Sequence, residues 1–207
     1  MSNLSDLLPS GAGGKQVDFV ASATLSNGQT VILNTNGTVT AITGSGSAES
    51  IPSGSVSSFQ SGVIYRTCVS MDPNNANKFI IAYAGGTGGY GRIAVGTISG
   101  NSISFGSDYV FSSVENNGSW VAFDPNTAGK FVVVYRASSS QANSKVGIVS
   151  GSTVSYGSAV TFNSANTREL CIGFDPNTAN RFVVTYSDLD AAGRSKVGTV
   201  SGTSISY

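Results

Sequence analysis

The chain has 207 residues and a net charge of zero, with only 11% charged residues against roughly 25% in an average soluble protein. Such sparse and balanced charge argues against nucleic acid as a partner, because neutralising many phosphates requires clustered cations. The sequence contains no histidine, the commonest general base and metal ligand, and no run of about 18 apolar residues that would indicate membrane insertion.

The first 45 residues predict a small N-terminal β-module. Asn-Gly is the preferred pair for a two-residue hairpin turn, and it occurs at Asn27-Gly28 and again at Asn36-Gly37. We therefore expect three short strands in a meander over residues 24–42. Residues 46–61 are rich in glycine and serine, which is typical of a linker.

Residues 62–207 contain one phrase three times. It reads MDPNNANKFIIAY at residues 71–83, FDPNTAGKFVVVY at residues 123–135 and FDPNTANRFVVTY at residues 174–186. The copies lie 52 and 51 residues apart, and glycines and aromatic residues downstream keep the period of 51. We place the three repeats at about 62–113, 114–164 and 165–207.

Each repeat is expected to form four antiparallel strands. The Asp-Pro-Asn phrase predicts a turn, since aspartate can bond its own backbone in an Asx-turn and proline fixes φ. A calcium ligand is the alternative interpretation of this aspartate. The run FVVVY that follows at residues 131–135 is apolar throughout, which is typical of a strand covered on both faces.

The predicted fold class is all-β, with a small N-terminal meander followed by four-stranded antiparallel repeats that resemble β-propeller blades. Three copies fall short of the usual 4 to 8 blades. Either the first sixty residues supply another sheet, or several chains assemble, or the chain is a shortened form of a longer repeat protein. A stack of four-stranded sheets that is not a propeller is the alternative architecture. The weakly charged surface favours association, so we expect a homo-oligomer.

Two cysteines occupy equivalent positions in the first and third repeats. Cys68 and Cys171 lie four residues before the repeated aspartates, where the second repeat has Trp120. One whole repeat between them makes a disulfide hard to close. We expect two apolar strand residues, with a redox or metal role as the alternative.

The segments that differ between repeats are the candidate ligand-binding loops, because specificity usually resides in variable loops on a rigid scaffold. Their largest side chains are Tyr90, Arg136 and Arg194, which are candidates to stack on or bond a sugar, and ordinary loop residues are the alternative interpretation. No catalytic, metal-binding or cofactor-binding motif is present, so we expect a non-enzymatic protein without cofactors. Asp188 and Asp190 lie close enough in sequence to suit carbohydrate cleavage, which is the least favoured alternative.

The opening LSDLLPSG, followed by VDFVASATLSNGQTVILNTNGTVTAI, resembles the start of many tail-fibre and tail-associated structural proteins of marine tailed bacteriophages. The resemblance implies a virion protein whose N-terminal module docks onto other tail proteins and whose repeats project toward a host-surface glycan or receptor. It also implies assembly in the host cytoplasm, and the sequence begins without the features of a secretory signal. A free, lectin-like β-propeller adhesin is the alternative.

Three leucines near the start are the candidate docking residues. Leu4, Leu7 and Leu8 form an apolar cluster that could order itself in a partner's groove. Alternatively, these side chains cover the edge of the chain's own first sheet.

Overall fold

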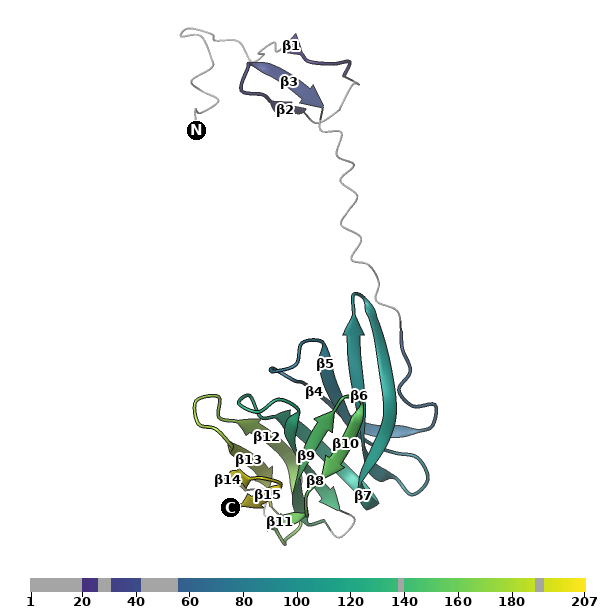
Figure 1. Ribbon diagram of the computed structural model, residues 1–207, viewed down its shortest axis with the longest axis vertical. Coiled ribbons are helices and arrows are strands. Elements are labelled where there is room, and N and C mark those ends of the chain that lie inside the picture. The colour runs from purple at the N-terminus through teal and green to yellow at the C-terminus, as the bar shows by residue number, and fades with distance from the viewer. Residues whose placement is uncertain (1–19, 26–30, 42–55, 138–139, 189–191) are drawn as a thin grey trace. The chain divides into compact units, whose positions relative to one another are not determined.

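The computed structural model divides the chain into two units, Met1–Pro52 and Ser53–Tyr207 (Figure 1). The described residues are 20–25, 31–41, 56–137, 140–188 and 192–207. All elements in these ranges are strands, so the predicted all-β class is confirmed for them. No helix in this part of the chain is long and apolar enough to cross a membrane.

The N-terminal unit contains a three-stranded sheet in the order β1-β3-β2. Its strands are β1 (Val20–Ala21), β2 (Val31–Leu33) and β3 (Thr38–Ala41). The predicted turn at Asn36-Gly37 is confirmed, since β2 and β3 are antiparallel neighbours and Gly37 has a left-handed φ of 82°.

The predicted meander is wrong at its first strand. β1 pairs in parallel with β3 instead of forming a hairpin with β2. Ser22 extends this pairing, because its backbone N and its Oγ both donate to the carbonyl of Val39, at 2.9 and 3.1 Å. The second edge of β3 is thereby satisfied, which places β3 in the middle. The predicted turn at Asn27-Gly28 lies outside the described residues.

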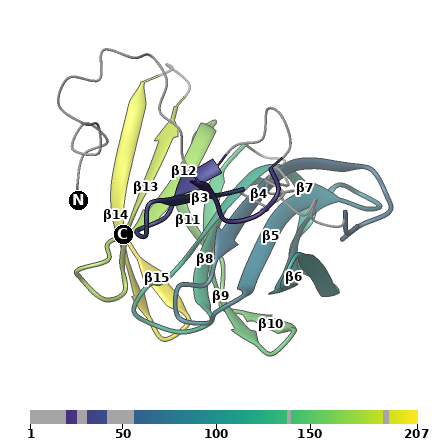
Figure 2. The same cartoon turned by 90° about the horizontal axis from the view of Figure 1, so that it is seen from above.

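The repeat unit contains twelve described strands in two sheets. The first two repeats share a sheet of order β10-β9-β8-β7-β6-β5-β4, in which β11 also pairs with β9. The third repeat forms the predicted four-stranded antiparallel sheet, β12-β13-β14-β15 (Figures 1 and 2). The bounds are β4 Ile64–Met71, β5 Lys78–Gly85, β6 Tyr90–Ser99, β7 Ser102–Phe123, β8 Lys130–Ala137, β9 Ala142–Ser150, β10 Thr153–Tyr156, β11 Val160–Asn163, β12 Arg168–Phe174, β13 Arg181–Ser187, β14 Gly193–Ser201 and β15 Ser204–Ser206.

The 22-residue strand β7 belongs to two repeats. It pairs with β6 as far as Glu115 and with β8 from Asn116 onward. It is therefore both the last strand of the first repeat and the first strand of the second. The predicted repeat boundary at about residues 113 and 114 lies two residues before the point where the pairing changes, and the chain continues there as one extended strand with register shifts.

The repeated Asp-Pro-Asn phrase forms the same turn in every copy. Each aspartate Oδ1 accepts a hydrogen bond of 2.9 Å from the backbone N–H two residues later. The pairs are Asp72–Asn74, Asp124–Asn126 and Asp175–Asn177. The predicted Asx-turn is therefore confirmed. The residue that ends each turn has a left-handed φ of 62° to 71°, which asparagine and glycine adopt most readily.

The hydrophobic core lies between successive repeats. Residues 131–134 of β8 are fully buried, which confirms the prediction of a strand covered on both faces. One face of β8 packs against the first repeat, including Ile80 and Val95. The other face packs against the third repeat, including Phe182 and Val184. Each repeat therefore buries its apolar surface against its neighbours, as in other repeat proteins.

Phe59 shows that the end of the predicted linker belongs to the repeat unit. Its ring centroid lies 5.2 Å from that of Tyr83 and 5.6 Å from that of Phe105. Equivalent ring contacts join Phe111 to Tyr135 and Tyr156, and Phe162 to Tyr186 and Tyr207. The sequence Gly-Ser-x-x-x-Phe precedes all three contacts, at residues 54–59, 106–111 and 157–162. The predicted linker 46–61 is thus wrong at its C-terminal end. The serine-rich residues there include a segment that recurs before each repeat and ends at a phenylalanine that packs on it.

Both cysteines have free thiols. Cys68 packs against the core between the first and second repeats, as expected for an apolar strand residue. Cys171 is exposed, because none of the described residues forms a repeat that covers the outer face of the third sheet.

Candidate functional site

The first strand of every repeat carries a bulge at the same place. In β4 the pairing register shifts between Tyr65 and Cys68, and β7 and β12 have equivalent shifts. The equivalent residue of each bulge has positive φ, with 54° at Arg66, 148° at Gly118 and 48° at Glu169. Such a conformation costs a non-glycine residue of order 1–3 kcal/mol and is found most often at binding sites. Bulges also redirect side chains, which here point toward a common space.

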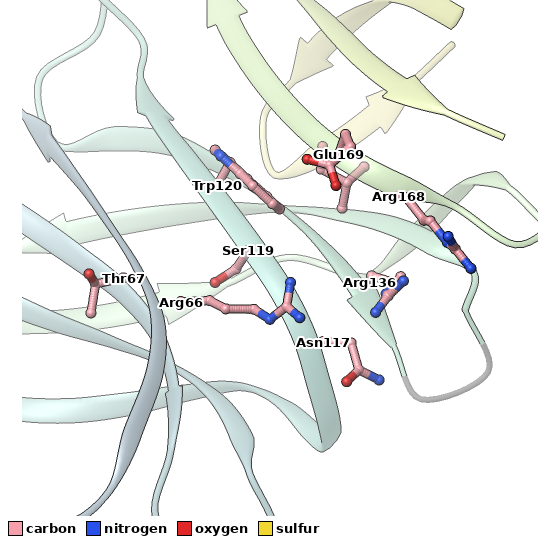
Figure 3. A pocket seen from close by; sticks show the side chains of 9 residues that line it. Arg66, Thr67, Asn117, Ser119, Trp120, Arg136, Arg168 and Glu169 are labelled. Carbon is pink, nitrogen blue, oxygen red and sulfur yellow. The ribbon is translucent and has the colours of Figure 1, made fainter. Parts of the chain in front are cut away.

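This space is a pocket of about 520 Å³ between the three repeats (Figure 3). Its volume lies in the range of roughly 300–1,000 Å³ that small-molecule sites occupy. The first strands β4, β7 and β12 line it together with the end of β8. The residues that define its chemistry are Arg66, Ser119, Trp120, Arg136, Arg168 and Glu169.

Three arginines, one from each repeat, dominate the pocket. In Figure 3 the guanidinium groups of Arg66 and Arg168 lie on either side of that of Arg136. Burial first, and then the positive charges of Arg66 and Arg168, lower the pKa of Arg136, while Glu169 acts in the opposite direction. Among the described residues, no ion pair involves any of these three arginines. The pocket therefore carries an excess of positive charge in a protein whose net charge is zero.

Hydrogen-bond donors in the pocket also lack partners. Arg136 donates from Nη1 to the carbonyl of Thr167 at 3.2 Å, but its Nε is buried without an acceptor. The Oγ of Ser119, which also lines the pocket, is likewise buried and unpartnered among the described residues. A buried polar group without a hydrogen-bond partner costs about 1–3 kcal/mol of stability. A ligand oxygen that accepted a hydrogen bond from one of these donors would recover part of that free energy.

Trp120 supplies an apolar wall to this otherwise polar pocket. The indole is half-buried and packs against the core between the second and third repeats. The carboxylate of Glu169 is the one acidic group among the lining residues. The arrangement can hold a negatively charged ligand with one flat apolar face, but it lacks the second carboxylate of a glycosidase.

The structure brings one of the three predicted ligand-facing residues to this pocket. Arg136 lines it, whereas Tyr90 and Arg194 lie elsewhere in the repeat unit. The prediction that all three lie in loops is wrong, because they belong to β6, β8 and β14, whose ladders extend farther than the sequence indicates. Arg194 donates from Nε to the carboxylate of Asp188 at 2.7 Å, within the hairpin of β13 and β14.

The remaining sequence candidates do not form a site among the described residues. Leu4, Leu7 and Leu8 lie outside the described ranges, as does Asp190. The carboxylate of Asp188 is engaged with Arg194. In the described part of the chain, no cluster of three or more histidine, cysteine, aspartate or glutamate residues could hold a metal ion.

Sequence reasoning missed most of the pocket. Arg66 is a single charge in the strand IYRTCVSM, and Arg168 begins the strand RELCIGF next to Glu169. Charge in the first strand of a repeat is the available signal. Strand alternation does not indicate where these side chains point, because the bulges change the alternation at that place.

Comparison with known proteins leaves the family open. No protein-family model and no curated protein matches the chain. The chain is similar to the crystal structure of Saccharomyces cerevisiae Sqt1, with 14% identity and a TM-score of 0.43, over 73% of this chain and 40% of that one. It is also similar to a protein from Lactobacillus plantarum, with 13% identity and a TM-score of 0.40, over 88% of this chain and 52% of that one. The chain thus spans about half or less of the length of these structures.

Proposed function

We propose that this protein is a non-enzymatic attachment protein whose repeat unit binds an acidic saccharide in the arginine pocket. One observation carries the proposal: Arg66, Arg136 and Arg168 converge from three repeats, and no described residue forms an ion pair with them. The planar guanidinium group makes paired hydrogen bonds to carboxylate, sulfate and phosphate groups. An anionic ligand would therefore offset the mutual repulsion of the three cations.

The apolar face of Trp120 and the unpartnered hydrogen-bond donors indicate that the anionic group belongs to a sugar. The indole of Trp120 offers an apolar face of the kind that amphipathic ligands cover. Ser119 Oγ and Arg136 Nε are buried donors without an acceptor, which suits a ligand rich in oxygen. A neutral saccharide would satisfy these donors but leave the three charges unpaired.

In this proposal the repeats are blades of a β-propeller-like array, and the protein is carried on a bacteriophage tail. The shared pocket supports the first statement, because the first strands of three consecutive repeats lie around one space (Figure 3). The resemblance of the first 45 residues supports the second. Residues 1–45 would dock onto other tail proteins, and the repeats would project toward a host-surface glycan.

Calorimetric titration of the full chain tests the binding. We expect uronate-containing or sulfated oligosaccharides to bind and neutral oligosaccharides of the same length not to bind, with an affinity that falls as salt is added. Arg136→Gln should weaken binding at least about tenfold, since it removes a charge-assisted contact worth about 1.5–3 kcal/mol. Arg194→Gln is the matched control and should bind normally. Equal binding of neutral sugars, or an unchanged affinity in Arg136→Gln, would contradict the proposal.

Incorporation into particles tests the location. A chain without residues 1–45 should fail to co-purify with assembled virions but still bind the saccharide. The Arg136→Gln chain should be incorporated normally but attach poorly to host cells. If the truncated chain is incorporated as well as the full chain, the docking role is wrong. Saccharide binding without any association with particles would instead favour a free lectin-like adhesin.

A further inference from the structure

Three equivalent apolar pairs join the second and third strands of the repeats. They are Ile80–Val95, Val132–Val146 and Val183–Val197. The first pair is 0% and 2% exposed and the second pair is fully buried, because each lies beneath the following repeat. Val183 and Val197 are 40% and 56% exposed. The outer face of the third repeat is therefore exposed, whereas the equivalent faces of the first and second repeats are buried in the core.

The opposite, rear face of the first repeat is open in the same way. Val69 and Met71 of β4 are 61% and 51% exposed. Their equivalents in the second repeat, Val121 and Phe123, are buried in the core shared with the first repeat. Inside the repeat unit, the outer face of each repeat packs against the rear face of the next. At the two ends of the unit, one face of each kind is left without such a partner among the described residues.

The segment that contains Phe59 supplies the backbone part of this contact. At the internal junctions, the equivalent segments pair with the third strand of the preceding repeat: Tyr109 lies opposite Ile93, and Val160 opposite Ser144. The corresponding residue of the third repeat is Ser195. Among the described residues, β14 pairs at Ser195 with β13 alone, because β15 covers only its C-terminal end.

We propose that two copies of this chain join head to tail. The rear face of the first repeat of one copy rests on the outer face of the third repeat of the other, and Ser57 lies opposite Ser195 in the added strand. The contact reproduces the two internal junctions, so its apolar pairs and its strand pairing are already specified by the chain itself. It does not depend on what the arginine pocket binds.

Two such contacts related by a twofold axis close a ring of six repeats, within the 4 to 8 blades of closed propellers. This closure rests on the propeller-like arrangement proposed above, whereas the contact itself rests on the equivalence of the faces.

Light scattering and native mass spectrometry of the full chain test the assembly. We expect twice the chain mass of 21.0 kDa at micromolar concentration, with dissociation on dilution. Val183→Lys on the outer face and Val69→Lys on the rear face should each give monomers with an unchanged circular dichroism spectrum. Val110→Lys is the matched control and should remain dimeric, because Val110 is exposed and its equivalent Thr161 stays exposed beside an internal junction.

Three results would overturn the proposal. They are a monomer at every concentration, a mass that grows beyond the dimer, and a Val69→Lys chain that stays dimeric while Val183→Lys does not. The last result would mean that two outer faces meet each other.

Cysteine pairing checks the strand register independently of the mass. In a background of Cys68→Ala and Cys171→Ala, Ser57→Cys combined with Ser195→Cys should form a disulfide between copies under mild oxidation. Ser58→Cys combined with Ser195→Cys is the register control, because neighbouring strand residues point to opposite faces. No cross-link, or equal cross-linking in both chains, would overturn the proposed pairing.

Discussion

The ring of Phe131 lies against the backbone of Gly147, its direct neighbour on the adjacent strand, so that a Cβ on Gly147 would overlap the end of the ring. The same relationship joins Phe79 to Gly96 and Phe182 to Gly198. A phenylalanine over a glycine is thus part of each repeat, and the bare glycine backbone makes room for the ring. Aromatic residues paired with glycine also help to fix the register of a sheet.

Gly147→Ala should destabilise the fold, because the added methyl group forces the Phe131 ring out of a fully buried position. Overpacking of this kind costs about 1–3 kcal/mol. Gly173→Ala is the control, since a Cβ there would meet no atom within 4 Å. Urea unfolding should show a lower midpoint for Gly147→Ala than for Gly173→Ala. Equal midpoints would mean that the ring can move aside without cost.

Asp72 links two repeats as well as forming its own turn. Its Oδ1 accepts from Asn74 N at 2.9 Å, and its Oδ2 accepts from Gly129 N of the second repeat at 3.0 Å in a buried position. Asp72→Asn keeps the turn but can present an NH₂ group to the N–H of Gly129, so we expect a loss of about 1–3 kcal/mol. The measurement is the free energy of unfolding.

The control for this change is Asp175→Asn in the third repeat. The carboxylate of Asp175 bonds Arg181 of its own repeat, and among the described residues it forms no hydrogen bond with another repeat. Its loss should therefore be smaller than that of Asp72→Asn. A loss in Asp175→Asn as large as that in Asp72→Asn would mean that the hydrogen bond from Gly129 across the repeats contributes no more than the Asp175–Arg181 pair within one repeat.

Tyr83 makes the stability depend on alkaline pH. Its hydroxyl donates to Asp108 Oδ2 at 3.0 Å, and burial together with this carboxylate raises the pKa of Tyr83 from 10.0 to about 12. The folded state therefore favours the protonated tyrosine. Its contribution is fully present below about pH 10 and is lost as the pH rises through about 12.

Denaturant unfolding at several pH values in this window, with tyrosinate absorbance as a second signal, checks the expectation. Tyr83→Phe should show a shallower decline of stability with pH. Some decline remains, because burial also raises the pKa of Tyr156 and Tyr207. A decline that is the same in Tyr83→Phe and in the unaltered chain would contradict the assignment.

Local chemistry decided which parts of the fold could be predicted. The Asp-Pro-Asn turns and the burial of residues 131–135 depend on a few neighbouring residues, and their sequence indicates them directly. The parallel pairing of β1 with β3 depends on a strand edge that no local pattern marks. The arginine pocket depends on how three repeats meet and on bulges at Arg66 and Glu169, where strand alternation fails. The sequence indicates Arg136 as a candidate because its segment differs between repeats, whereas no local pattern predicts its position in the pocket.

Glu169 offers a test in which a substitution should improve binding. Its carboxylate is the one acidic group lining the arginine pocket, and its charge acts on Arg136 in the direction opposite to that of the two other arginines. It therefore offsets part of the positive charge that the proposed acidic ligand would meet. Glu169→Gln keeps the size of the side chain and removes the charge, so we expect severalfold tighter binding of an acidic saccharide, with the largest gain at low salt.

The same titration that measures Arg136→Gln measures this variant, and the two substitutions should move the affinity in opposite directions. Asp108→Asn is the control, because Asp108 is paired with Arg92 outside the pocket and should leave the affinity unchanged. Weaker binding in Glu169→Gln would mean that the carboxylate accepts hydrogen bonds from the ligand. In that case the pocket would recognise sugar hydroxyls through Glu169, and the charge of the ligand would not be the main determinant of its affinity.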